Sequence, residues 1–154
     1  MVWAAWWYPV LMRAEQTLFR DLALFALPIK HFWKESVENG TLPVWHPDLG
    51  NGLPFLADLS NQVLYPLNVV VLAAPDATTG LSWLIAIHYW LAPLAMFALL
   101  RVLCRSFWIA LLGACLYGAS GYVVSIGDNI NYLPATVWCP LALACVAAAS
   151  PGGS

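Results

Sequence analysis

Long apolar runs fill the second half of the chain. Residues 81–100 supply 20 positions without a charged side chain, residues 106–126 supply 21, and residues 132–149 supply 18. A helix needs about 20 apolar residues to cross the hydrocarbon core of a bilayer, where each backbone amide must be satisfied within the segment. The pattern therefore predicts three transmembrane helices, at 81–100, 106–126 and 132–149.

The middle run also carries small residues at every fourth position, Ala110, Ala114 and Gly118. Such a stripe lets a neighbouring helix approach closely. The alternative, three buried helices of a soluble core, is disfavoured because no polar helix faces remain to cover them.

The first half has a different pattern, because eleven of the fourteen charged residues lie in residues 1–76. Pro28 is typical of a helix start, and Gly40 of the position just beyond a helix that ends near Asn39. This helix is amphipathic, with an apolar face and a charged face: Ile29, Phe32, Trp33 and Val37 against Lys30, Lys34, Glu35 and Glu38. It is expected to lie on the membrane surface or to pack against the rest of its loop.

Turn-forming residues dominate the next stretch, from Gly40 to Pro66. Residues 63–74 are apolar but too short to cross a membrane, which indicates a shallow or re-entrant element.

Composition supports a membrane protein. Apolar residues make up 62% of the 154 residues and charged residues only 9%, whereas a soluble domain carries about 25% charged residues. The net charge of −2 excludes a strongly basic nucleic-acid-binding surface. The predicted fold class is an all-α polytopic membrane protein, a transmembrane helix bundle with a long outer loop that carries an amphipathic interfacial helix.

The short connectors predict the orientation. Arg101 and Arg105 lie on one connector, which should be cytoplasmic, whereas residues 127–131 carry no lysine or arginine and should lie outside. Residues 13–80 are then extracytoplasmic. Residues 1–12 are interpreted as the remnant of a first transmembrane helix and residues 150–154 as the start of a cytoplasmic loop, so the chain is expected to be a piece of a longer protein.

Motifs for nucleotide binding and for zinc-dependent hydrolysis are absent from the sequence. The five aspartates predicted to face outward are the remaining candidates for chemistry: Asp21, Asp48, Asp58, Asp76 and Asp128. Asp21 follows Arg20 directly after the apolar N-terminal stretch, which places a base and a cation near lipid head groups. The alternative is that Asp21 caps a helix starting at Leu22. Asp48 and Asp76 adjoin prolines and are interpreted as turn residues.

A series of landmarks in the loop resembles the YfhO-like family of bacterial membrane proteins. It comprises Gly40-x-Leu42-Pro43-x-Trp45-His46-Pro47, Gly50-Asn51-Gly52-x-Pro54-Phe55-Leu56-Ala57 and Tyr65-Pro66-Leu67-Asn68, with Ser120-Gly121 and Trp138-x-Pro140 further on. The resemblance covers roughly residues 17–141, and one departure is His46, where the family more often has asparagine. The family is grouped with the GT-C glycosyltransferases, which use polyprenyl-phosphate-linked sugars.

The resemblance implies a site. Asp21 matches the acidic residue that acts in the first outer loop and would serve as general base in an inverting sugar transfer. The departing phosphate requires positive charge, for which the candidates are Arg20, Lys30 and Lys34. Asp128 could join Asp21 in holding a divalent cation, although two carboxylates are weak evidence for a metal. Other candidate substrate contacts are Trp45, His46, Asp58, Tyr65, Asn68 and Asp128, with loop packing as the alternative for several of them.

Three functions are therefore compared. The first is a transferase of the bacterial cytoplasmic membrane that takes a lipid-linked sugar donor and a glycan or polymer acceptor. The second is a non-catalytic membrane protein whose loop binds a glycan or partner. The third is a transporter component, for which only His88 and Pro93, within a predicted span, offer support.

Overall fold

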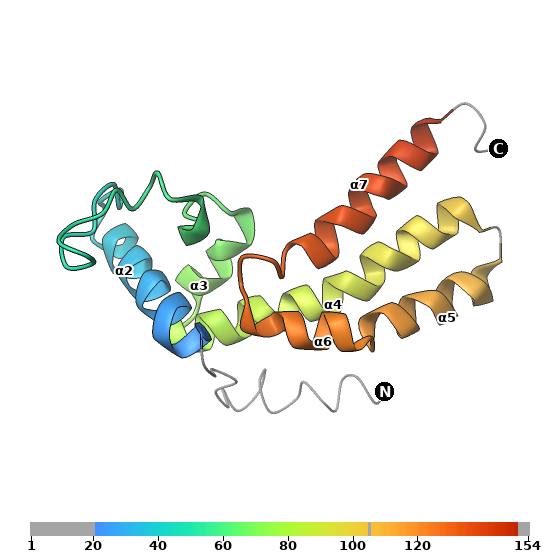
Figure 1. Ribbon diagram of the computed structural model, residues 1–154, viewed down its shortest axis with the longest axis horizontal. Helices are drawn as coiled ribbons and strands as arrows, with labels where there is room; N and C mark the ends of the chain where they lie inside the picture. The colour runs from blue at the N-terminus through green and yellow to red at the C-terminus, as the bar shows by residue number, and fades with distance from the viewer. Residues whose placement is uncertain (1–20, 105, 151–154) are drawn as a thin grey trace. The chain divides into compact units, whose positions relative to one another are not determined.

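The computed structural model describes residues 21–104 and 106–150. These residues form helices and turns, and their one β-type pairing is an isolated antiparallel bridge between His46 and Leu53. The chain divides into two compact units, Met1–Ala86 and Ile87–Ser154. Helix α4 (Ala77–Leu103) runs from the first unit into the second (Figure 1). The all-helical fold predicted from the sequence is confirmed for the described residues.

The first unit begins with a π-helical turn, η1 (Leu22–Ala26), that leads directly into α2 (Leu27–Glu38). The predicted end of this helix is confirmed, since Asn39 is its C-terminal cap and Gly40 adopts a left-handed φ of 70°. The predicted start at Pro28 is one residue late, and helical structure already precedes it in η1. Pro28 lies in the first turn of α2, where its missing N–H costs no hydrogen bond.

Only half of the charged face expected on α2 meets solvent. Lys30 and Lys34 are 2% and 7% exposed, and Trp33 between them is also buried. The exposed charged side chains of α2 are the carboxylates of Glu35 and Glu38, which are 65% and 56% exposed. The amphipathic prediction is therefore confirmed for the two glutamates and wrong for the two lysines, because both lysine ammonium groups find carbonyl acceptors inside the first unit. This arrangement favours the alternative in which α2 packs against its loop.

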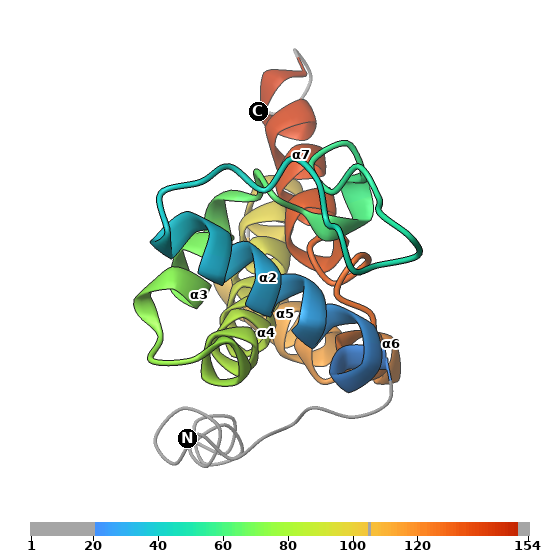
Figure 2. The ribbon, with the colours of Figure 1, turned by 90° about the vertical axis from the view of Figure 1, so that its left-hand side faces the viewer.

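The loop after α2 forms a short hairpin closed by backbone hydrogen bonds between His46 and Leu53, 2.9 and 3.0 Å long. Gly52, at φ 101°, lies against the ring of Trp45, and a Cβ atom there would be 2.6 Å from Trp45 Cζ2. A glycine is therefore required at this turn by both backbone conformation and space. Figure 2 shows the loop running beside α2 within this unit.

Short helical turns connect the hairpin to α4: η2 (Leu59–Asn61), η3 (Pro66–Asn68) and α3 (Val69–Ala73). Residues 66–73 thus form a helical element too short to cross a membrane, as the sequence indicates for this region. Asp76, directly before α4, accepts hydrogen bonds from the amide and the hydroxyl of Thr79, both 2.8 Å long. These bonds lower the pKa of Asp76 below its ordinary value. They show that Asp76 caps the start of α4, where the sequence predicted a turn residue.

In the second unit, α4 packs antiparallel against α5 (Phe107–Gly118). Gly113 faces Leu100, and Gly118 faces Pro93, so that a Cβ on Gly118 would be 3.1 Å from Pro93 Cβ. Ala110 and Ala114 are buried on the same face. The prediction that this small-residue stripe admits a close neighbouring helix is confirmed.

Within residues 21–104 and 106–150, two stretches are long and apolar enough to cross a membrane, Ala77–Leu103 and Phe107–Asp128. The second one is interrupted at Ala119 and continues as α6 (Gly121–Ser125) and η4 (Ile126–Asp128), with the Ser120 hydroxyl accepting from the Val123 amide. The third predicted span is a helix of 15 residues, α7 (Ala135–Ala149), which is shorter than the predicted 132–149. Its passage through the membrane stays a prediction.

A tyrosine compensates for the proline inside α7. Pro140 lacks an N–H, so the carbonyl of Thr136, four residues earlier, loses its helical hydrogen bond. The Tyr117 hydroxyl of α5 donates to that carbonyl at 3.0 Å. The contact joins α5 to α7 at the point where the α7 backbone is interrupted.

We expect Tyr117→Phe to destabilise the second unit by about 1–3 kcal/mol, because it leaves a carbonyl unpaired in an apolar setting. In a Pro140→Ala background the new amide can bond the Thr136 carbonyl, so the same substitution should cost much less. Thermal unfolding in detergent micelles of the four proteins in this double-mutant cycle measures the coupling. Tyr122→Phe is the control, since Tyr122 is 59% exposed. Equal costs in the two backgrounds would contradict the compensation.

Candidate functional site

The centre of the first unit is the buried ammonium group of Lys30. Its Nζ atom donates to the carbonyl of Asn61 in η2, 3.1 Å away. Among the described residues, the Asn61 carbonyl is the hydrogen-bond acceptor of Lys30. Burial disfavours the charged form and lowers the pKa of Lys30 from 10.5 to about 8. Lys30 is thus a cation at neutral pH, held beneath the loop.

This pKa predicts a pH dependence of stability. Between the folded pKa of about 8 and the unfolded value of 10.5, the unfolded chain holds a proton on Lys30 that the folded chain has lost. Stability should therefore rise with pH in this window, by at most about 1.4 kcal/mol per pH unit. Unfolding of the protein and of Lys30→Met across pH 7–11 measures this rise. A rise of the same slope in the variant would exclude Lys30 as its cause.

Lys34 has a different role from Lys30. Its Nζ atom donates to the carbonyls of Val71, Leu72 and Ala74, at 3.1, 3.1 and 2.7 Å. It also pairs with Glu38 at 3.0 Å. Because an ammonium group has three protons, these acceptors saturate it. Lys34 caps the C-terminal end of α3 and fixes α2 to the segment just before α4.

The loop next to Lys30 is held by an aromatic cluster of Phe32, His46 and Phe55. The ring centroids of Phe32 and His46 are 4.0 Å apart, and those of Phe32 and Phe55 are 4.9 Å apart in an edge-on arrangement. Asn61 Nδ2 donates to the Phe55 carbonyl at 2.8 Å. Lys30, Asn61, Phe55 and His46 therefore form one connected group in the first unit.

The remaining predicted contacts in the loop serve mainly local structure. Asp58 Oδ1 accepts from the amide and the hydroxyl of Ser60, at 2.9 and 2.5 Å, and the hydroxyl bond is the main cause that lowers its pKa. Asn68 is 1% exposed, and its Nδ2 donates to the Gln62 carbonyl. Its Oδ1 is buried with no hydrogen-bond partner among the described residues. Tyr65, half-buried, lies between these two residues along the chain.

The predicted catalytic residue lies apart from this group. Asp21 is exposed at the first position of the described chain, and its side chain makes no capping hydrogen bond to η1. The helix-cap alternative for Asp21 thus finds no support. Nine residues separate Asp21 from Lys30, which is more than about 10 Å along a helix axis. Arg20 lies outside the described residues, and Asp128 is exposed in η4 of the second unit.

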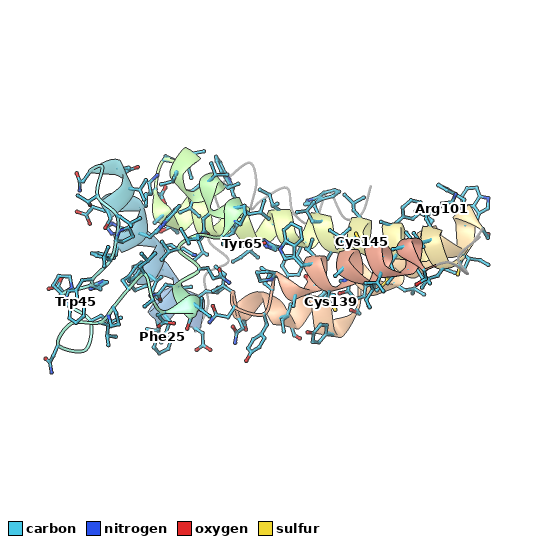
Figure 3. All side chains as sticks on the ribbon, turned by 90° about the horizontal axis from the view of Figure 1, so that it is seen from above. Phe25, Trp45, Tyr65, Arg101, Cys139 and Cys145 are labelled. Atoms are coloured by element: carbon cyan, nitrogen blue, oxygen red, sulfur yellow. The ribbon has the colours of Figure 1, made fainter. Side chains whose placement is uncertain are left out.

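The structure therefore connects Lys30 to His46 within one group and leaves Asp21 exposed outside it. Trp45 is also exposed, on the loop after α2 (Figure 3). Sequence reasoning missed Asn61 and Phe55, which connect Lys30 to His46. The signal available for Asn61 was its place three residues after Asp58, typical of a short helical turn capped by aspartate. Within the described residues, no group of three histidine, cysteine, aspartate or glutamate side chains is arranged to hold a metal ion.

The model of one protein family matches the chain, with the description "Bacterial membrane protein YfhO", over residues 13–148. Comparison with curated proteins and with solved structures found no significant match. The matched range includes both described units and confirms the resemblance seen in the loop landmarks. The chain therefore belongs to the YfhO family of bacterial membrane proteins.

Proposed function

We propose that this membrane protein is a glycosyltransferase that moves a sugar from a polyprenyl-phosphate-linked donor to an extracytoplasmic glycan or polymer acceptor. In this proposal residues 13–80 lie outside the bacterial cytoplasmic membrane. Membership in the YfhO family supports the reaction class, because the family is grouped with the GT-C transferases. The observation that carries the proposed mechanism is the exposed carboxylate of Asp21, which is not used as a helix cap.

The proposed reaction is a single displacement at the anomeric carbon. Asp21 takes the proton of an acceptor hydroxyl as its oxygen forms the new bond to that carbon. The bond from the anomeric carbon to the phosphate oxygen breaks, and the phosphate leaves with the electron pair. Attack from the opposite side inverts the configuration.

The developing charge on the phosphate requires a nearby cation. Arg20 is the proposed contact, because it adjoins Asp21 and a guanidinium can bind two phosphate oxygens at once. Lys30 could contribute only if its bond to the Asn61 carbonyl is given up, since the side chain is buried. Lys34 is saturated by carbonyls and Glu38, and we assign it to the scaffold.

One observation favours a second candidate, a loop that binds a glycan or partner without chemistry. The predicted contacts Asp58 and His46 use their polar atoms within the loop, with His46 Nδ1 accepting from the Asp48 amide at 3.3 Å. Trp45 remains 55% exposed and could stack on a sugar ring.

Transfer of a labelled sugar from a polyprenyl-phosphate donor by the full chain in membranes tests the proposal. Product formation that depends on both the donor and the protein is expected. Glycan binding without any transfer would establish the second candidate in its place. Neither transfer nor glycan binding would overturn both.

A further inference from the structure

We propose that the hairpin of the first unit rests in the head-group region of the lipid bilayer through an apolar rim. We define the rim as Leu42, Val44, Trp45, Leu49 and Leu53, the exposed apolar side chains of the hairpin. This contact does not depend on the transferase proposal, because it concerns only how the first unit meets the membrane.

The rim is exposed although its residues are apolar. Its five side chains are between 43% and 61% exposed. From Gly40 to Ala57 the only charged residue is Asp48, and no lysine or arginine occurs between Lys34 and Arg101. A group of exposed apolar side chains on one short hairpin is typical of a binding or membrane-contact site, and tryptophan is favoured at the membrane–water interface.

The backbone conformation of the hairpin and its buried contacts keep the rim side chains at the surface. The His46–Leu53 bridge fixes the two arms, and the Trp45 ring is seated on Gly52. Phe55, 1% exposed, packs edge-on against Phe32 and is the large apolar side chain that this part of the loop buries. The apolar rim is thus a fixed feature of the folded unit.

The length of α4 places the first unit at the depth of the membrane interface. A helix of 27 residues is about 40 Å long, whereas the hydrocarbon core is about 30 Å thick. Arg101 lies in the last turn of α4, and about 20 residues back from it the core ends near Leu81. The first unit includes α4 up to Ala86, so part of this unit lies level with the head groups or just below them.

Lys34 connects α2, and with it the hairpin, to the segment that leads into α4. It fixes α2 to the carbonyls of residues 71–74, a few residues before α4 begins. Phe55 and His46 then pack on Phe32 of the same helix. The hairpin therefore cannot move far from the start of α4 without breaking contacts inside the unit, and the bilayer offers an apolar surface at that depth.

Site-directed spin labelling of the full chain in phosphatidylcholine vesicles tests this contact. The four native cysteines, Cys104, Cys115, Cys139 and Cys145, are free and are first replaced by serine. Single labels are then introduced by Val44→Cys and Leu49→Cys, with Glu35→Cys on the exposed side of α2 as the matched control. Collision of each label with oxygen, which concentrates in lipid, is compared with collision with a water-soluble nickel complex.

Oxygen collisions should exceed nickel collisions at positions 44 and 49, with the reverse at position 35. Labels at 44 and 49 that behave like the label at 35 would overturn the proposal by placing the rim in water. Labels at 44 and 49 shielded from both reagents would also overturn it, because a protein surface would then cover the rim. Two separate rim positions guard against one label disturbing the hairpin.

Discussion

Replacing Lys34 by methionine is expected to destabilise the first unit by about 3–5 kcal/mol. Methionine keeps much of the length and volume of the side chain but donates no hydrogen bond. The carbonyls of Val71 and Ala74, which accept buried bonds from Lys34 at 3.1 and 2.7 Å, would then lack a donor. Each unpaired buried carbonyl costs about 1–3 kcal/mol, and the favourable interaction of a cation with the C-terminal end of α3 is also lost. Thermal unfolding in detergent micelles measures the loss.

Glu38→Gln is the matched control for Lys34→Met. It removes the charge of Glu38, the acidic partner of Lys34 among the described residues, whose side chain is 56% exposed. An exposed ion pair contributes about 0–1 kcal/mol, so this variant should unfold close to the original protein. If both variants lose similar stability, the ion pair rather than the carbonyl cap is the important contact. If neither loses stability, Lys34 is not part of the scaffold and becomes available again for a donor phosphate.

The same lysine shows where sequence reasoning works and where it stops. The helix from Leu27 to Glu38 is predicted well because proline and glycine act locally at its ends. The burial of its two lysines is not predicted, because a helical pattern treats lysine as polar and contains no information about acceptors far away in the sequence. The carbonyls that bury Lys34 are 37 to 40 residues away in sequence. The sequence pattern of a single helix therefore cannot predict a buried lysine that is paired with distant backbone carbonyls.

The second unit illustrates the opposite case. The stripe of Ala110, Ala114 and Gly118 predicts a close helix contact, and the structure places Pro93 against Gly118. This prediction succeeds because alanine and glycine have small side chains, so their spacing along the helix is enough to show where a second helix can approach closely. The link from Tyr117 to the Thr136 carbonyl depends instead on which tyrosine faces Pro140, and that is decided only when α5 and α7 pack.

The candidate site falls between these cases. The residues chosen for their chemistry, such as Lys30 and Asp58, are real features of the loop, but hydrogen bonds within the loop engage them. Asp21 differs because it is exposed and its carboxylate does not cap η1. The proposed chemistry therefore depends on Asp21 more heavily than the sequence alone indicates.

Asp21→Asn is expected to reduce sugar transfer by about 10²–10⁴-fold, the usual contribution of a positioned general base. Asparagine has nearly the same size and remains polar, but its amide cannot take the proton of the acceptor hydroxyl. Because the side chain is exposed and makes no capping bond, the folded protein should be equally stable. The rate of labelled-sugar transfer in membranes, normalised to the amount of protein, measures the effect, and unfolding of both proteins in micelles checks the stability.

Asp48→Asn separates a specific base from a general effect of negative charge on the loop. Asp48 is also an exposed aspartate in the first unit, and its substitution removes the same charge. An exposed substitution away from the reaction shifts free energies by about 0.5 kcal/mol or less, so transfer should change by about twofold at most. Transfer that survives Asp21→Asn, or that falls equally in both variants, would remove Asp21 from the mechanism. A loss confined to Asp21→Asn, with stability unchanged, would establish its carboxylate as the group on which the reaction depends.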